Sequence, residues 1–271
     1  MTQTVRQVLA LSSLVPVDAK VLLAHALGCN RAWLAAHEQD PLTKEQADAF
    51  GALVRRRVAG EPVAYLTGTR EFWGLDLNVT PDVLIPRPET ETLVEFALTK
   101  LPPDRNVRVL DLGTGSGAIA LALAHDRPNA QVTATDRSEE ALAVACANAS
   151  RLELPNVALV AADWYEGVPS GTWDLIASNP PYIGAVDPHL QEGDLRFEPV
   201  AALSPGVDGH SALRIIVGGA CERLASGGWL VVEHGYDQSE AVQLLFRDAG
   251  FAEVAALRDL AGIHRVVAGH F

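Results

Sequence analysis

The chain has 271 residues and a mass of 28.9 kDa, which is enough for one large or two ordinary domains. Hydrophobic residues make up 48% and charged residues 20%, as in a typical globular protein, so wholesale disorder is excluded. The net charge of −13 is uneven: residues 1–75 hold 8 basic and 7 acidic side chains, whereas residues 76–271 hold 13 and 27. An acidic chain binds nucleic-acid phosphates poorly, so we expect a small ligand or a basic partner.

Three widely spaced cysteines, Cys29, Cys146 and Cys221, form no CxxC motif, so we expect neither a disulfide framework nor a metal site. No secretory signal is visible, and the apolar runs are shorter than the roughly 18 residues of a membrane helix. These features predict a cytoplasmic protein that does not contact a membrane. Nothing in the pattern indicates an obligate dimer, and we expect a monomer.

Residues 1–59 have the apolar periodicity of a small helical domain. Gly28 is placed to end one helix, and Thr43 opens a capping box for another. The basic triplet Arg55–Arg57 complements the negative end of a helix dipole, and a partner-binding patch is the alternative.

Residues 60–88 differ from what precedes them. Trp73, Leu75 and Leu77 alternate with polar residues, which is the period of a strand, and several prolines exclude a helix nearby. We expect a β-hairpin linker between two domains.

From residue 89 to residue 271, strands alternate with helices, which predicts an α/β, doubly wound, Rossmann-like sheet that is mostly parallel. A short loop joins the last two strands, so one antiparallel edge strand is expected. A long loop should run from Asn179 to about Gly209. The predicted strands are Val107–Leu112, Gln131–Asp136, Val157–Ala162, Leu175–Ser178, Trp229–Glu233, Ala252–Leu257 and His264–Ala268.

A glycine-rich turn follows the first of these strands. Gly113, Gly115 and Gly117 allow a tight turn and a close approach of a ligand to the backbone. Asp136 ends the second strand, where a carboxylate can accept two hydrogen bonds from a ribose diol. A tight turn without a ligand is the alternative reading of the glycines.

Asp111, two residues before Gly113, indicates which nucleotide cofactor the glycine turn binds. A carboxylate at this place repels a pyrophosphate but attracts a cation, which favours S-adenosylmethionine over NAD. Asp163, after the third strand, can accept from an adenine amino group. Trp164 can pack on the ring, or can simply cover the core.

The sequence Asn179-Pro180-Pro181-Tyr182 closes the fourth strand. The prolines stiffen the turn, and the carbonyl of Pro180 and the side-chain oxygen of Asn179 are two acceptors suited to an NH₂ group. Tyr182 offers a ring on which a planar group can stack. Acceptors that hold both N–H groups stabilise the positive charge that a planar nitrogen gains when it is methylated. An ordinary proline turn is the alternative.

Asp111–Gly117, Asp136 and Asn179–Tyr182 together resemble a class I methyltransferase acting on planar nitrogen, a pattern shared with adenine-N6 methyltransferases of DNA and RNA. Other segments are similar to the bacterial peptide chain release factor N5-glutamine methyltransferases, and this resemblance covers nearly the whole chain. These segments are Gly60–Gly68, Arg70–Gly74, Leu84–Glu91, Arg196–Pro199, Ala202–Leu203 and Glu233–Gln238.

The resemblance implies methylation of the side-chain amide N5 of the glutamine in the Gly-Gly-Gln loop of release factors. It implies that Asn179–Tyr182, including Pro181, receive the glutamine amide. Arg87 and Glu89 would lie at the mouth of the site beside the loop that carries Phe197, or form a salt bridge that ties the linker to the catalytic domain. The cofactor residues implied are Gly113, Thr114, Gly115, Ser116, Gly117, Asp136, Trp164 and Asn179.

Two other functions are considered. The acidic charge of residues 76–271 disfavours a nucleic-acid adenine methyltransferase, because a duplex would meet a repulsive surface. A noncatalytic cofactor-binding scaffold has no need of the Asn179–Tyr182 turn. Glu233 and His234 end a predicted strand, and we expect the histidine to be a hydrogen-bonded structural residue without a catalytic role.

Overall fold

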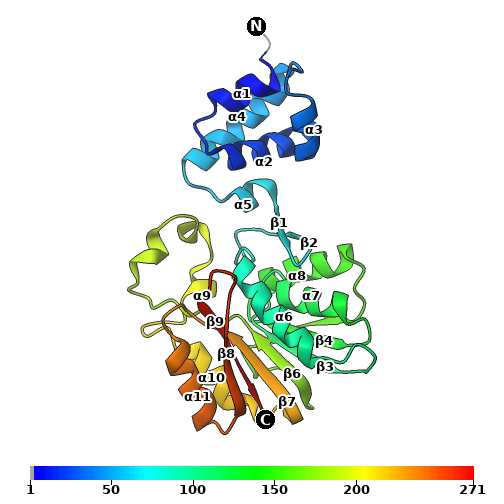
Figure 1. The fold of residues 1–271 in the computed structure, drawn as a ribbon, viewed down its shortest axis with the longest axis vertical. Helices are drawn as coiled ribbons and strands as arrows, with labels where there is room; N and C mark the ends of the chain where they lie inside the picture. Colours follow the sequence, from blue (N-terminus) through cyan, green and yellow to red (C-terminus); the bar gives the residue numbers. More distant parts are fainter. Residues whose placement is uncertain (1–2) are drawn as a thin grey trace. The chain divides into compact units, whose positions relative to one another are not determined.

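The computed structural model describes residues 3–271, and the chain divides into two compact units, Met1–Thr69 and Arg70–Phe271. The first unit is helical, and the second contains the large sheet (Figure 1). Within the described residues, no helix is long and apolar enough to cross a membrane.

The helical unit is built from short helices around one apolar core. Thr4 and Thr43 each form a complete capping box, and Gly28 ends a helix in the left-handed conformation, as its position predicted. Leu22, Leu23 and Phe50 are buried in the core. The helices are α1 (Val5–Leu11), α2 (Pro16–Leu27), α3 (Arg31–Ala36), α4 (Lys44–Val58) and α5 (Val63–Thr67).

A two-stranded hairpin follows, formed by β1 (Thr69–Phe72) and β2 (Leu75–Asn78). Both turn residues, Trp73 and Gly74, have positive φ, as the right-handed twist of a two-residue hairpin requires. The hairpin is shorter than the predicted segment 60–88, because α5 occupies part of that segment. A short helix of this kind has too little periodicity to be read from sequence.

The second unit contains a seven-stranded sheet with the order β5-β4-β3-β6-β7-β9-β8. All neighbouring strands are parallel except β9, which is antiparallel to both β7 and β8. This confirms the predicted fold class. The strands are β3 (Arg108–Leu112), β4 (Gln131–Asp136), β5 (Val157–Ala161), β6 (Trp173–Ser178), β7 (Leu224–Glu233), β8 (Ala252–Arg258) and β9 (His264–His270).

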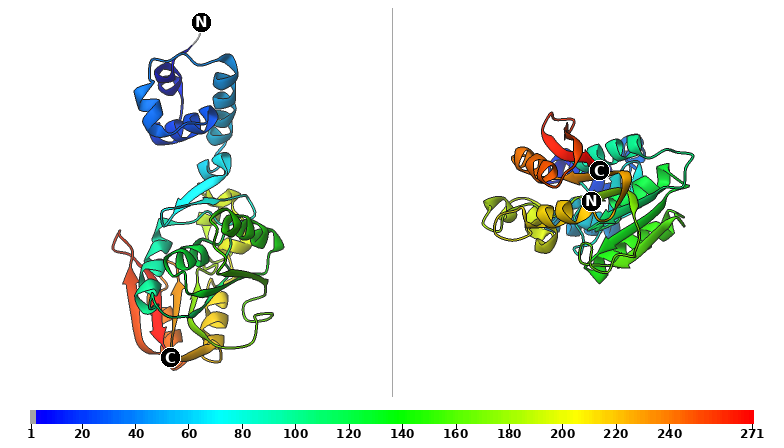
Figure 2. Two further views of the ribbon diagram at one scale, coloured as in Figure 1. Left: turned by 90° about the vertical axis from the view of Figure 1, so that its right-hand side faces the viewer. Right: turned by 90° about the horizontal axis from the view of Figure 1, so that it is seen from below.

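Helices cover both faces of this sheet (Figures 1 and 2). One face packs against α6 (Glu91–Lys100), α7 (Ala118–Asp126) and α8 (Glu139–Arg151). The other packs against α10 (Ser211–Ala220) and α11 (Ser239–Asp248). β4, the next strand along the chain, lies on one side of β3, whereas β6 lies on the other side. The strand order therefore reverses between β3 and β6, and a crevice is expected at the carboxyl ends of these two strands.

Further details of the second unit differ from the sequence prediction. The expected loop after Asn179 contains two 3₁₀ turns, η2 (Pro188–Gln191) and η3 (Leu195–Phe197), and a helical turn, α9 (Val200–Leu203). The helix expected from residue 89 is preceded by a 3₁₀ turn, η1 (Pro88–Thr90). β7 begins five residues before the predicted Trp229, because its glycines hide the apolar alternation.

Adjacent glycines in α10 provide a matched test of the packing. A Cβ at Gly218 would meet no atom within 4 Å, whereas one at Gly219 would lie 2.6 Å from the ring of Tyr165. That ring cannot retreat freely, since its hydroxyl donates to the carbonyl of Ile216 at 2.8 Å. Gly218→Ala should therefore raise the free energy of unfolding by about 0.5–1 kcal/mol, and Gly219→Ala should lower it by about 1–3 kcal/mol. Denaturant unfolding would measure both, and equal effects would contradict the packing.

Candidate functional site

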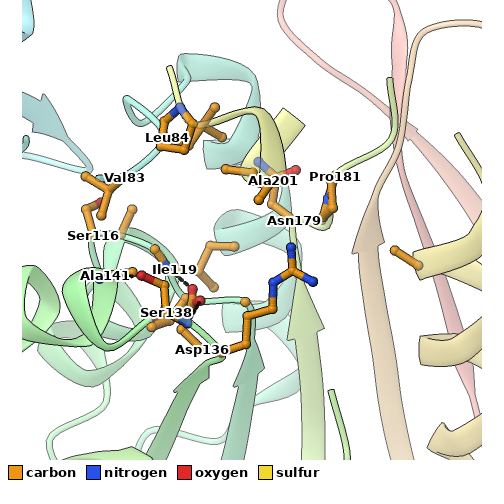
Figure 3. A pocket seen from close by; sticks show the side chains of 18 of the residues that line it. Val83, Leu84, Ser116, Ile119, Asp136, Ser138, Ala141, Asn179, Pro181 and Ala201 are labelled. Atoms are coloured by element: carbon orange, nitrogen blue, oxygen red, sulfur yellow. Dashed lines mark hydrogen bonds between the residues drawn. The ribbon is translucent and has the colours of Figure 1, made fainter. Parts of the chain in front are cut away.

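A cavity of about 480 Å³ lies in the second unit, at the carboxyl ends of β3, β4 and β6. This volume suits a nucleotide-sized ligand. Asp136, at the end of β4, and Asn179, directly after β6, line the same space (Figure 3). Val83 and Leu84 line it from the segment after the hairpin.

The glycine-rich turn forms part of the cavity wall. Gly113, Gly115 and Gly117 have φ of 71°, 55° and 89°, a region that side-chain-bearing residues rarely adopt. A Cβ at Gly115 would meet no atom within 4 Å, whereas one at Gly117 would lie 2.9 Å from the Leu121 side chain. Gly113 and Gly115 line the ligand space, whereas Gly117, which was also predicted to bind the cofactor, is outside the lining and instead allows α7 to pack closely. Thr114 and Ser116 also line the cavity.

The carboxylate of Asp136 braces this turn while it faces the cavity. Its Oδ2 accepts the N–H of Gly115 at 2.9 Å, and its Oδ1 accepts the N–H of Ser138 at 3.0 Å. A carboxylate oxygen can accept more than one hydrogen bond, so acceptor capacity remains for a ligand hydroxyl. Asp136 ends β4 and faces the cavity, and its predicted contact with a ribose diol stays a prediction.

Asp111 is fully buried beneath the turn and does not line the cavity, so the structure does not support its predicted direct contact with a ligand. Its Oδ2 accepts the hydroxyl of Thr114 at 2.6 Å and the N–H of Ala120 at 3.2 Å. Burial raises the pKa of Asp111 to about 7. The other oxygen, Oδ1, is buried without a partner among the described residues. An orphaned acceptor at this place is suited to a cation above the turn.

Asp163 and Trp164 both line the cavity after β5. Trp164 also packs against the apolar core, and its ring lies 3.7 Å from the Cβ position of Gly113. The ligand-facing and core-covering readings of this tryptophan are therefore both consistent with its position.

The turn after β6 brings Asn179 and Pro181 to the cavity, whereas Pro180 is buried and outside the lining. The side-chain Nδ2 of Asn179 donates to the hydroxyl of Thr90 at 3.2 Å, which leaves its Oδ1 available. Tyr182 does not line the cavity. Its hydroxyl instead donates to Oε1 of the buried Glu233 at 3.3 Å. Because the ring is away from the cavity, the structure does not support the predicted stacking role.

Arg87 lines the cavity and pairs with a residue distant in sequence. Its guanidinium donates to Oε1 of Glu198, whose side chain is fully buried, and Oε2 accepts the N–H of Ile85 at 3.1 Å. Arg87 therefore forms a salt bridge of the expected kind, which ties the end of the predicted linker to the loop before α9. Glu89 and Phe197 are outside the lining. Glu89 takes no part in this pair, and the Phe197 ring lies under the Arg196 guanidinium at 5.0 Å.

Sequence reasoning missed Thr90, Glu198 and Glu233. Each is almost completely buried, and each hydrogen-bonds a residue that was predicted for the site. The only sequence signal was their position within segments that resemble a known family. The proline-rich stretch before Thr90 gave no periodic pattern from which its orientation could be derived.

The sheet order and the cavity at the glycine turn define the methyltransferase fold. A methyltransferase from Pyrococcus furiosus shares it, with a TM-score of 0.56 and 21% identity over 80% of this chain and 96% of that one. So does a 16S rRNA methyltransferase from T. thermophilus, in complex with AdoMet and guanosine, with a TM-score of 0.55 and 21% identity over 74% of this chain and 49% of that one.

Closer relatives identify the family. Residues 3–68 match the PrmC N-terminal domain, and residues 90–191 match the methyltransferase small domain. The release factor glutamine methyltransferase of Xylella fastidiosa is 54% identical over 93% of this chain and 92% of the relative. That of Bordetella pertussis is 53% identical over 98% of both, and that of Escherichia coli is 46% identical over 94% and 91%. The chain belongs to the release factor glutamine methyltransferase family.

The pair of Arg87 and Glu198 should be energetically coupled. Arg87→Met should lower the free energy of unfolding by about 3 kcal/mol, because it leaves a buried carboxylate without its cation. Adding Glu198→Gln should recover most of this loss, since a neutral amide needs no cation and still accepts the N–H of Ile85. Denaturant unfolding of the wild type, both single variants and the double variant gives the coupling energy. Additive losses would contradict it.

Proposed function

We propose that the chain transfers a methyl group from S-adenosylmethionine to the side-chain amide N5 of the glutamine in the Gly-Gly-Gln motif of peptide chain release factors. The observation that carries this proposal is the orientation of Asn179. Its NH₂ group is used by Thr90, so its carbonyl oxygen is the atom left to accept an N–H at the cavity. The names of the relatives supply the substrate class.

The residues of the cavity fit this cofactor. We assign Asp136 to the ribose hydroxyls, Asp163 to the adenine amino group and Trp164 to the face of the ring. The orphaned Oδ1 of Asp111, beneath the turn and reached through a water, suits the positive charge of the methionine portion. The bound cofactor would supply an electrophilic methyl group on a sulfonium.

We assign the amide-binding role to the turn after β6. The Oδ1 of Asn179, which lines the cavity, is assigned to one N–H group of the glutamine amide. The carbonyl of Pro180, a buried residue outside the lining, is kept as the predicted acceptor of the second N–H group, and together they would hold the nitrogen toward the methyl group. The nitrogen becomes more positive as its bond to carbon forms, so both acceptors bind the transition state more strongly than the ground state. The methylated amide then loses a proton to solvent, and no strong base is required.

Residues 1–59 are proposed to form a helical domain that holds the protein substrate. Residues 60–88 are proposed as the linker between this domain and the methyltransferase domain. The acidic charge of residues 76–271 suits a cationic cofactor and a basic partner loop, and disfavours nucleic acid. We further propose that the enzyme acts as a monomer in the cytoplasm.

Methyl transfer can be tested with methyl-labelled S-adenosylmethionine. The chain is incubated with an unmodified release factor, with the same factor carrying alanine in place of the glutamine, and with adenine-containing DNA. We expect label on the first substrate alone. Label in DNA would show an adenine methyltransferase, and cofactor binding without any transfer would show a scaffold.

Asn179→Ala should reduce kcat by about 10²–10³-fold, since one of two acceptors for the developing charge is lost. The fold should survive, because this side chain is only partly buried. Single-turnover methylation measures the effect, and circular dichroism checks the fold. Full activity in a folded variant would refute the role of Asn179.

Asp136→Asn should weaken binding of S-adenosylhomocysteine by about 10–100-fold, because a hydrogen bond to a charged acceptor is lost. Isothermal titration calorimetry measures this affinity. Asp104→Asn is the matched control, since it removes the same charge from an exposed position. Equal weakening in both variants would mean that net charge, and not the local carboxylate, binds the cofactor.

A further inference from the structure

A buried asparagine in α8 joins two segments that border the cavity. Asn148 is fully buried, although asparagine is a poor helix former and its amide is costly to bury without partners. Its Oδ1 accepts the N–H of Asn78 at 2.7 Å, and its Nδ2 donates to the carbonyl of Asn78 at 3.0 Å. The same Nδ2 donates to the carbonyl of Ser116 at 2.9 Å. One side chain therefore connects α8, the end of β2 and the glycine-rich turn.

The partners of Asn148 determine how its amide is oriented. A backbone carbonyl can only accept a hydrogen bond, and a backbone N–H can only donate one. The two carbonyls therefore require the NH₂ group of Asn148, and the N–H of Asn78 requires its oxygen. A reversed amide would place an oxygen against two carbonyl oxygens and would lose all three hydrogen bonds. Asn148 is thus held in a single orientation.

The hydrogen bond to Ser116 fixes one peptide group of the glycine-rich turn. The carbonyl of this peptide is that of Ser116, and its N–H is that of Gly117, which donates to the carbonyl of Thr114 at 2.9 Å. Because both polar groups are paired, the peptide cannot rotate without breaking a hydrogen bond. Ser116 lines the cavity (Figure 3). Asn148 therefore helps to set the wall that the turn presents to a ligand.

The two hydrogen bonds to Asn78 fix the start of a second cavity segment. Asn78 is the last residue of β2 and lies outside the cavity lining. The chain then turns at once, and the N–H of Val83 donates to the carbonyl of Thr80 at 3.1 Å. Val83 and Leu84 line the cavity directly after this turn (Figure 3). Because so few residues separate them from Asn78, its attachment to α8 limits where they can lie.

We propose that Asn148 is a positioning residue for cofactor binding, which holds the glycine-rich turn and the segment after β2 in the arrangement that receives S-adenosylmethionine. Asn148 lies outside the cavity lining, so it acts through Ser116 and Asn78. This inference rests on the proposed function, since it concerns the cofactor assigned there.

Removal of the amide should lower the affinity for the cofactor without slowing the chemical step. Asn148→Ala frees the two segments from each other, so only a fraction of the molecules is ready to bind, and the Kd of S-adenosylhomocysteine should rise by about tenfold or more. The KM for S-adenosylmethionine should rise with it. The value of kcat at saturating cofactor should stay within about twofold, because bound cofactor restores the arrangement. Isothermal titration calorimetry and initial rates with a release factor measure these quantities.

Asn156→Ala is the matched control. The Nδ2 of Asn156 donates to the backbone carbonyls of Ala124, Arg127 and Ala130 at 3.1, 3.3 and 3.2 Å, and none of these residues lines the cavity. This variant also loses the hydrogen bonds of one amide and should lose stability, yet its Kd for S-adenosylhomocysteine should stay near the wild-type value. Equal rises in Kd in both variants, or a wild-type Kd in folded Asn148→Ala, would overturn the proposal.

A measurement on the unaltered chain keeps the test independent of how the variants fold. Coupling between two sites is reciprocal, so a ligand that fixes the turn must also strengthen the attachment of Asn78 to Asn148. S-adenosylhomocysteine should therefore slow hydrogen exchange of the Asn78 N–H, as measured by nuclear magnetic resonance. An exchange rate that the ligand leaves unchanged would overturn the proposal. A wild-type chain that binds no S-adenosylhomocysteine would instead refute the cofactor of the proposed function.

Discussion

The turn Asn179–Tyr182 borders the open cavity on one side and is hydrogen-bonded to a buried carboxyl group on the other. The site depends on this placement of the turn. The turn ends β6, which pairs with β3 where the strand connections diverge, so it shares an edge of the sheet with the glycine turn. Two prolines stiffen it, the side chain of Asn179 donates to the hydroxyl of Thr90, and the hydroxyl of Tyr182 donates to Glu233. The Asn179 acceptor therefore needs little reorganisation when a substrate amide arrives.

The acidic residues at the other side of the cavity serve two purposes. Asp136 braces the backbone of the glycine turn and still faces the cavity. Asp111 lies below the turn, where burial and the charge of Asp136 both raise its pKa. A cation bound above the turn would stabilise the ionised form of Asp111. Asp82, Asp136 and Asp163 line the cavity together with Arg87 and Arg137, so only a small part of the acidic excess of the second unit lies where the cationic cofactor is proposed.

Local patterns predicted much of this architecture. Strand alternation gave the order of elements, and the glycines, Asp136 and Asn179 lie together because each follows a parallel strand at the same edge. Side-chain direction was not predictable, so Asp111 and Tyr182 were expected in the cavity and lie behind its wall. Partners distant in sequence were also invisible: Thr90 and Asn179 are 89 residues apart, and Arg87 and Glu198 are 111 residues apart. Such pairs are decided by tertiary packing, which leaves no local period.

In the proposed mechanism, Asn179 and Pro180 present two converging acceptors to a glutamine amide. A crystal structure of the chain with S-adenosylhomocysteine and a Gly-Gly-Gln peptide would test it most directly. We expect the Oδ1 of Asn179 and the carbonyl oxygen of Pro180 each to lie about 3 Å from the glutamine amide nitrogen, the distance of a hydrogen bond. A glutamine whose carbonyl oxygen faces Asn179, or which lies outside the cavity, would contradict it.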